Sequence, residues 1–243
     1  MKFFHKLFTD LQGLRRYPQT YIEGKPNYDA YWRERRGEEG SKKSSLTSWQ
    51  KQRVDIITPF IEAQSSLVDI GCGDGSISKY LSAQKDLRVL GIDTSDVALR
   101  AAQAEGIPTL KLDIFDPSQY MQIPEADYVV AFEIIEHMPN SEDFLMLLRQ
   151  KACKAIFVSI PNSGYYIHRL RLLFGHFPLQ WVNHPGEHVR FWTVLDFYQW
   201  CSMLRLNPQW IITYEGLPFL NQIFPRLFAQ GIIAMIPGGD TTS

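Results

Sequence analysis

The sequence predicts an α/β fold in which helices cover both faces of a doubly wound, mostly parallel sheet. Two observations lead to this prediction. Short apolar runs alternate with segments of helical periodicity from residue 66 onward, and a glycine-rich turn, GCGDG, follows the first apolar run. Strands that alternate with helices form parallel sheets, because each helix returns the chain to the same edge. With 243 residues, of which 45% are hydrophobic and 21% charged, the chain suits one such domain with additions.

The elements of this sheet can be read in chain order. The predicted strands are SLVDIGC, RVLGIDT, PTLKLDI, ADYVVAFEII and KAIFVSIPN, and the helices between them are GSISKYLSAQ, SDVALRAAQAEG and a segment from Ser141. Thr193 and Asp196 have the spacing of a capping box, which predicts a helix over TVLDFYQWCSMLR. Two late strands, PQWIITYE and FAQGIIAMIP, bring the sheet to seven strands and close its edge.

Two segments lie outside this alternation. Residues 1–64 form a predicted N-terminal arm or lid, with a loop over residues 27–45 and an amphipathic helix over Trp49–Glu62. Residues 65–243 form the main domain, and residues 164–190 interrupt it as a predicted cap insertion over a substrate or as a plain hairpin of helices. The basic, aromatic start, MKFFHKLF, predicts either a helix packed on its own domain or a contact with a membrane or partner surface.

Composition excludes several classes of protein. A formal net charge of −1 gives no electrostatic footprint for DNA or RNA. Three cysteines without CxxC spacing predict neither a disulfide framework nor a zinc knuckle. No apolar run approaches the roughly 18 residues that a membrane span needs. Asp10 and Gln12 interrupt any signal-peptide core, so we expect a cytoplasmic protein without a transmembrane segment.

The glycine-rich turn predicts a ligand that tolerates acidic side chains. A turn of this kind lets a ligand approach the backbone, and the helix that follows attracts anions. However, Asp69 and Asp74 flank the turn and would repel a pyrophosphate. S-adenosylmethionine fits, because it has no phosphate and carries a sulfonium and an ammonium cation. Asp69 would face its cationic end, and the turn would contribute Gly71, Cys72, Gly73 and Gly75.

Further candidate cofactor residues lie at the ends of the next three predicted strands. Asp93, beside Thr94, follows the glycines by about twenty residues and is placed to accept hydrogen bonds from ribose hydroxyls. Asp113 could accept a hydrogen bond from the adenine amino group while Ile114 packs on the ring. Phe132 could cover the other side of the ring. All of these positions share the edge where doubly wound sheets bind ligands.

The motifs together resemble a known family. VDIGCGDG, GID, LDI and FEIIEHMP, in this order, resemble the class I S-adenosylmethionine-dependent methyltransferases. VSIPNSGYYIHRLRLLFGHFP and PRLFAQGIIAMI are similar to the MetW-like (methionine biosynthesis protein W) branch. The resemblance covers about residues 66–237 and implies a Rossmann-like methyltransferase sheet. One departure is that MetW-like proteins usually lack a Glu-x-x-Glu-His sequence, which this chain has at Glu133, Glu136 and His137.

The same Glu-x-x-Glu-His sequence is similar to a stretch of the ubiquinone-biosynthesis and small-RNA O-methyltransferases, where that stretch supplies ligands to a divalent metal. A later histidine lies near the site in both, and GEHVRFWT places His188 there. Glu133, Glu136, His137 and His188 could thus hold a metal that lowers the pKa of a hydroxyl. Alternatively, His137 or His188 acts as a general base without metal, or the group is only structural.

Two functions follow from the resemblance. The first is methyl transfer from S-adenosylmethionine to a small-molecule, glycan or lipid-linked acceptor, with oxygen as the expected nucleophile. The second is a cofactor-binding accessory protein that associates with a homoserine O-acyltransferase. Glu133, Glu136 and His137 favour the enzyme.

Overall fold

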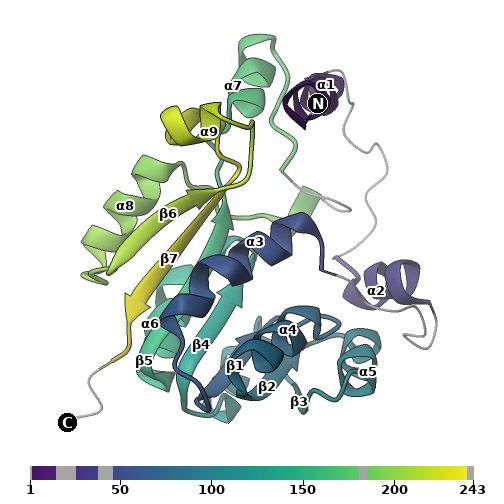
Figure 1. The fold of residues 1–243 in the computed structure, drawn as a ribbon, viewed down its shortest axis with the longest axis vertical. Coiled ribbons are helices and arrows are strands. Elements are labelled where there is room, and N and C mark those ends of the chain that lie inside the picture. The colour runs from purple at the N-terminus through teal and green to yellow at the C-terminus, as the bar shows by residue number, and fades with distance from the viewer. Residues whose placement is uncertain (1, 15–25, 38–45, 181–184, 240–243) are drawn as a thin grey trace.

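A single seven-stranded sheet with helices on both faces forms the body of the molecule (Figure 1). The computed structural model describes residues 2–14, 26–37, 46–180 and 185–239. The strand order is β3-β2-β1-β4-β5-β7-β6. The strands are β1 Ser66–Ile70, β2 Arg88–Asp93, β3 Thr109–Lys111, β4 Ala126–Phe132, β5 Ala152–Pro161, β6 Trp210–Tyr214 and β7 Gly231–Pro237.

The sheet is mostly parallel, as predicted. Strands β1 to β5 pair in parallel, whereas β7 runs antiparallel to both β5 and β6. The central β1 pairs with β2 on one side and β4 on the other, so Val68 lies opposite both Leu90 and Val129. The strand order reverses between β1 and β4, and doubly wound sheets bind ligands beyond the carboxyl ends of the strands at such a point.

The structure contains the helices that the sequence predicts and adds helices over residues 28–36, 220–223 and 225–228 that the sequence does not predict. The helices are α1 Lys2–Leu14, α2 Tyr28–Arg36, α3 Ser48–Ile57, α4 Ser76–Lys85, α5 Asp96–Ala104, α6 Ser141–Lys151, α7 Tyr166–Leu173, α8 Val194–Met203, α9 Leu220–Ile223 and α10 Pro225–Phe228, with 3₁₀ turns η1 Thr58–Phe60, η2 Pro117–Gln122, η3 Ile135–His137 and η4 Pro185–Glu187. The capping box of Thr193 and Asp196 is present at the start of α8. None of the helices in the described ranges is long and apolar enough to span a bilayer.

Each face of the sheet has its own hydrophobic core. Phe144 of α6 and Phe197 of α8 pack on one face. Val54 and Ile57 of α3 and Leu81 of α4 pack on the other. Because α3 supplies buried core residues, this part of the predicted arm over residues 1–64 is packed into the main domain.

The prediction of a loop over residues 27–45 is wrong for its first part, which is helix α2. The Asn27 side chain caps this helix by accepting a hydrogen bond from the Ala30 N–H (3.0 Å). Helix α2 packs against α5, where the Asp29 carboxylate accepts a hydrogen bond from the Ser95 hydroxyl (2.6 Å). The composition of the segment is polar, so capping and packing rather than an apolar stripe stabilise the helix. Residues 38–45 lie outside the described ranges.

Helix α1 packs on its own domain, which was one of the two expectations for the start of the chain. It lies against α7, and the buried Asp10 carboxylate accepts hydrogen bonds from the hydroxyls of Tyr165 (2.6 Å) and Tyr166 (3.0 Å). Lys6 pairs with the same carboxylate at 2.9 Å. These contacts compensate the buried charge and fix the inner face of α1.

Gly75, which directly precedes the first residue of α4, gives a test of the packing between α4 and α5. Gly75 has a φ of +72°, and a Cβ there would lie 2.9 Å from the Ala102 Cβ of α5. Gly106 has a φ of +81° but no heavy atom within 4 Å of its Cβ position. In both Ala variants, a residue with a Cβ must adopt a left-handed backbone, which lowers the free energy of unfolding by about 1–2 kcal/mol. Gly75→Ala also overpacks the helix contact, so we expect it to lose a further ~1–3 kcal/mol of unfolding free energy in urea titrations. Equal losses in both variants would contradict this packing.

Candidate functional site

A cavity of about 630 Å³ lies at the carboxyl ends of the central strands, where the strand order reverses. Its volume is in the range of small-molecule sites. Residues of the glycine turn, of the strand ends and of helices α2 and α3 line it together. The lining includes Tyr28, Tyr31, Trp32, Arg35, Arg36, Trp49, Arg53, Gly71, Cys72, Gly73, Asp74, Asp93, Thr94, Ile114, Phe115, Phe132, Glu133, His137, Glu187 and His188. The cavity therefore brings together most of the residues that the sequence singles out.

The glycine turn is shaped so that helix α2 rests directly on it. Gly73 has a φ of +55°, and a Cβ there would lie 2.4 Å from the ring of Trp32. Asp74 accepts hydrogen bonds from the N–H (3.1 Å) and hydroxyl of Ser76 in the first turn of α4, and it pairs with Arg36 of α2. The start of α4 thus already has a carboxylate, which disfavours a phosphate there.

Asp69 lies beneath this turn and outside the set of cavity-lining residues. Its side chain is buried and accepts a hydrogen bond from the Ser78 hydroxyl (2.5 Å). Burial raises the pKa of Asp69 to about 7, which means that the carboxyl is partly protonated near neutral pH. Gly75 also lies outside this set, because it packs against α5.

Asp93 lies on the cavity wall, at the end of β2 and beside the turn. Its two carboxylate oxygens accept hydrogen bonds from the N–H groups of Gly73 and Ser95, both at 2.9 Å. Burial raises the pKa of Asp93, and these hydrogen bonds oppose the shift. The neighbouring Thr94 lines the same wall. The bonds fix the direction of the carboxylate, which is what a hydrogen-bond acceptor for a ligand requires.

The three residues predicted to surround an adenine are not gathered in that way. The Asp113 carboxylate accepts a hydrogen bond from the Phe115 N–H (2.9 Å), and Asp113 is outside the cavity lining. Ile114 and Phe132 do line the cavity, but they belong to cores on opposite faces of the sheet. Phe132 lies under the Arg53 guanidinium, 5.2 Å from the ring centroid.

Helix α2 supplies cavity residues that the sequence interpretation missed. The rings of Tyr28 and Phe115 stack with their centroids 6.5 Å apart. Trp32 covers Gly73, and the Arg35 guanidinium lies 4.2 Å from the Tyr31 ring centroid. Aromatic residues three and four positions apart share one face of a helix. The run YDAYWRE has that spacing, so its pattern could have revealed this side of the cavity.

Glu133 is held by a buried arginine that the sequence interpretation also missed. Arg53 of α3 places Nη1 3.2 Å from the Glu133 carboxylate and 3.1 Å from the Ser159 hydroxyl. Ser159 and Tyr214 donate hydrogen bonds to the same carboxylate (2.9 and 3.3 Å). Glu133 has a φ of +56°, uncommon for a residue with a side chain. Its negative charge is therefore compensated and its position fixed.

Glu136 is a completely buried carboxyl group, and among the described residues neither of its oxygens has a hydrogen-bond partner. Burial first, and then the nearby Glu133, raise the pKa of Glu136 well above its ordinary value. Its backbone carbonyl accepts hydrogen bonds from the N–H groups of Val189 (2.9 Å) and Arg190 (3.0 Å). These two bonds bring the end of the predicted cap insertion, residues 164–190, against η3. Residues 181–184 of that insertion lie outside the described ranges.

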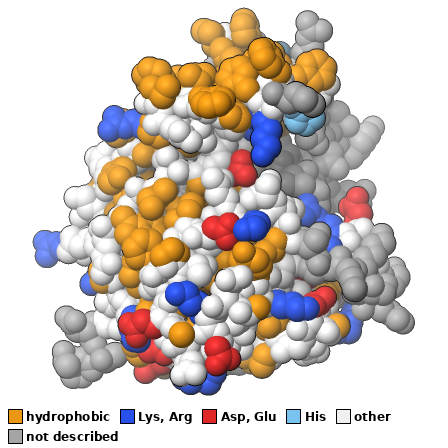
Figure 2. Space-filling model, in the orientation of Figure 1, with side chains coloured by type: hydrophobic (Ala, Val, Ile, Leu, Met, Phe, Trp, Pro, Cys, Tyr) orange, Lys and Arg blue, Asp and Glu red, His pale blue; other side chains and the backbone are white. Residues whose placement is uncertain are grey.

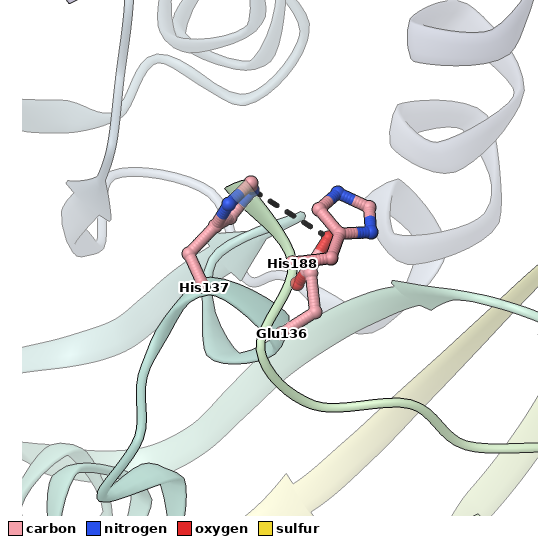
Figure 3. A group of neighbouring side chains, drawn as sticks. All are labelled: Glu136, His137 and His188. Atoms are coloured by element: carbon pink, nitrogen blue, oxygen red, sulfur yellow. Dashed lines mark ion pairs between the residues drawn. The ribbon is translucent and has the colours of Figure 1, made fainter. Parts of the chain in front are cut away.

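Two histidines lie beside Glu136 (Figure 3). His137 donates Nδ1–H to the Glu187 carbonyl (2.5 Å), which leaves the lone pair on Nε2, 3.9 Å from Glu136 Oε1. Its ring meets that of His188 edge to face, with the centroids 4.7 Å apart. The Nδ1 atom of His188 is buried and has no hydrogen-bond partner in the part of the chain that the structure describes, and burial lowers the pKa of His188 to about 3. Burial also lowers the pKa of His137.

The structure groups three of the four predicted metal-ligating or catalytic residues. One ligand atom each from Glu136, His137 and His188 lies within 4.8 Å of the others, whereas Glu133 is outside this group and pairs with Arg53. Buried polar atoms are normally hydrogen-bonded, so orphaned atoms on both Glu136 and His188 call for a partner. A carboxylate and two neutral imidazoles fit a divalent transition-metal cation.

Comparison with known proteins finds a matching family model and curated relatives. The family model of methionine biosynthesis protein MetW matches residues 51–220. A ubiquinone biosynthesis O-methyltransferase of Methylobacterium sp. (strain 4-46) is 29% identical over 154 residues, covering 60% of this chain. The chain spans only 56% of that relative's length.

Solved structures show the same fold at low sequence identity. The magnesium protoporphyrin IX methyltransferase of Synechocystis PCC 6803 with bound SAH superposes with a TM-score of 0.57 at 14% identity, over 98% of this chain and 100% of that one. A SAM-dependent methyltransferase of Archaeoglobus fulgidus gives 0.56 at 16% identity, over 87% and 100%. The sheet therefore has the Rossmann-like fold of these methyltransferases, as predicted.

The buried Glu136 predicts a specific pH dependence of stability. An acid whose pKa is raised by folding holds its proton in the folded state above its unfolded pKa of about 4.3, so its contribution to stability falls as the pH rises. The glutamine of the Glu136→Gln variant does not titrate, so it makes no such pH-dependent contribution. In the presence of chelator, we expect the unfolding free energy of the variant to improve relative to wild type between about pH 5 and about pH 7.5. If the difference in unfolding free energy between variant and wild type stays constant with pH, or if wild type improves relative to the variant, the raised pKa is contradicted.

Proposed function

The chain belongs to the methionine biosynthesis protein MetW family, and from this premise we propose that it transfers a methyl group from S-adenosylmethionine to an acceptor oxygen. One observation carries the proposal. A single cavity joins the glycine turn and Asp93, which suit the cofactor, to His137 and His188, which suit activation of an acceptor together with Glu136, a carboxyl group buried beside them and outside the cavity lining. Positioning the two substrates in one enclosed space accounts for much of the catalysis of such a transfer.

The cofactor would lie along the turn with its ribose on Asp93. The Asp93 carboxylate would accept hydrogen bonds from the ribose hydroxyls, and the backbone at Gly71 and Gly73 would allow close approach of the amino-acid end. Because Asp74 already covers the start of α4, a pyrophosphate would meet a negative charge there. The stacked Tyr28 and Phe115 are the proposed contacts for the adenine.

The acceptor would meet the group of Glu136, His137 and His188, which we propose binds a divalent cation. Lowered histidine pKa values keep both imidazoles neutral at pH 7, which suits metal ligands and makes them weak bases. When bound, the cation would lower the pKa of an acceptor hydroxyl. The Glu187 carbonyl orients the His137 ring through Nδ1.

A small-molecule hydroxyl is the proposed acceptor, and a glycan or a lipid-linked hydroxyl would present the same nucleophile. The accessory role beside a homoserine O-acyltransferase would not require a buried, unpartnered donor set. Glu136 and His188 have such orphaned atoms, and they favour the enzyme.

The cofactor site predicts a selective loss of binding. Asp93→Ala should weaken S-adenosylhomocysteine by about 1–3 kcal/mol in calorimetric titration, because the ribose hydroxyls lose a charged acceptor. Asp96→Ala is the matched control, since that carboxylate is exposed, pairs with Lys111 outside the cavity lining and should leave the affinity unchanged. NAD serves as the control ligand. Equal losses in both variants would remove Asp93 from the site, and tighter binding of NAD than of S-adenosylhomocysteine would reject the assigned cofactor.

The proposed cation predicts a measurable metal content. Protein purified without chelator should contain close to stoichiometric metal by elemental analysis, and the Glu136→Gln/His137→Ala double variant should lose it. His176→Ala is the control, because that histidine is exposed and outside the group. Absence of metal in wild type, even after incubation with divalent salts, would reject the cation. A general-base role for His137 would then predict a turnover about 10²–10⁴-fold lower in His137→Ala.

A further inference from the structure

One end of the molecule presents a concentration of exposed apolar side chains, visible at the top of Figure 2. We call this surface the apolar tip. It comprises Phe4, Phe8 and Leu11 of α1, Leu172, Leu173, Phe174 and Phe177 of α7 and the residues after it, and Phe219, Ile223 and Phe224 around α9. Phe4, Leu173 and Phe219 are 74%, 76% and 72% exposed. Contiguous exposed patches of this kind on soluble domains mark interaction surfaces.

The helices of the apolar tip are apolar on two sides. The inner side of α1, with Phe3, Leu7 and Leu14, packs against the cluster around Tyr165 and Tyr166. Its outer side, with Phe4 and Phe8, faces away from the domain. A surface helix usually turns polar residues outward, so the outer apolar side is not explained by packing within the described part of the chain.

The exposed charges within the segments that form the apolar tip are cationic, and two carboxylates outside these segments, Asp55 and Glu215, line a pocket at its Phe219 edge. Helix α1, residues 166–180 and residues 217–230 contain the cations Lys2, Lys6, Arg169, Arg171 and Arg226. Over the same ranges the acidic residue is Asp10, which is buried and paired with Lys6. Lys2, Arg169 and Arg226 are exposed. The apolar tip is therefore a cationic surface with aromatic side chains.

We propose that the apolar tip docks on an anionic phospholipid bilayer. The exposed phenylalanines would enter the boundary between headgroups and acyl chains, while Lys2, Arg169 and Arg226 would meet lipid phosphates. Charge complementarity distinguishes this occupant from a second copy of the chain, because two cationic tips would repel each other.

Docking in this way would bring the cavity close to the bilayer. Strand β5 ends at Pro161, which lines the cavity, and α7 of the apolar tip begins five positions later at Tyr166. Figure 1 shows α1, α7 and α9 beyond this end of the sheet. The proposal concerns binding and does not depend on the methyl transfer proposed above.

Vesicle flotation with the full chain tests the proposal. We expect wild type to bind vesicles of phosphatidylcholine with about 30 mol% phosphatidylglycerol at least tenfold more strongly than phosphatidylcholine alone, since each exposed cation adds to the attraction. Phe4→Glu/Phe8→Glu should lower binding to the anionic vesicles at least about tenfold, and Lys2→Glu/Arg226→Glu should abolish the preference for anionic lipid.

Met121→Glu/Met203→Glu is the matched control, because these residues are 79% and 75% exposed but lie in η2 and at the end of α8. It should bind like wild type, and all variants should keep the wild-type melting temperature. Wild type that fails to bind anionic vesicles overturns the proposal, as does an equal loss in the control. Self-association in ultracentrifugation that Phe4→Glu/Phe8→Glu abolishes would assign the surface to a second copy and also overturn it.

Discussion

The contact between the Trp32 ring and the backbone at Gly73 is the constraint on which the site depends. It exists because residue 73 has no side chain, since a Cβ would lie 2.4 Å from the ring. Through this contact and the ion pair of Arg36 with Asp74, a helix from the start of the chain becomes one wall of a cavity whose other walls are strand ends. The glycine turn therefore shapes the ligand site and also seats the helix that encloses it.

Burial of charge explains how the far wall of the cavity differs from the turn. Arg53 pairs directly with the Glu133 carboxylate at 3.2 Å and holds it in place. Glu136, three residues further on, contacts the His137 ring at 3.9 Å, and within the described ranges neither its oxygens nor His188 Nδ1 have a hydrogen-bond partner. Unpaired buried polar atoms cost stability, and proteins keep them mainly where a ligand or a reaction uses them. We therefore interpret η3 and the His188 segment as the reactive side of the cavity.

The sequence predicted the sheet well and the site in part, for physical reasons. Strand and helix periodicity is local, so all seven strands were predicted. The ends of parallel strands meet at one edge of the sheet, so Asp93 and His137 were expected to lie near each other, and both line the cavity. Arg53 was missed because its pairing with Glu133 joins residues 80 positions apart (133 − 53). Helix α2 was missed because its segment is polar overall, and the aromatic face of Tyr28, Tyr31 and Trp32 at helical spacing was not recognised. The Asp69 side chain is directed by its hydrogen bond from the Ser78 hydroxyl, and the Asp113 side chain by its hydrogen bond from the Phe115 N–H. Composition does not reveal either contact.

The central claim is that one cavity holds the cofactor between the glycine turn and helix α2, with its reactive end toward Glu136, His137 and His188. A crystal structure of the chain with S-adenosylhomocysteine tests it most directly. The account predicts the ribose hydroxyls on the Asp93 carboxylate, the sulfur facing the side of His137, and α2 closed over the ligand. A ligand bound outside this cavity, or bound within it without contact to Asp93, would contradict the account.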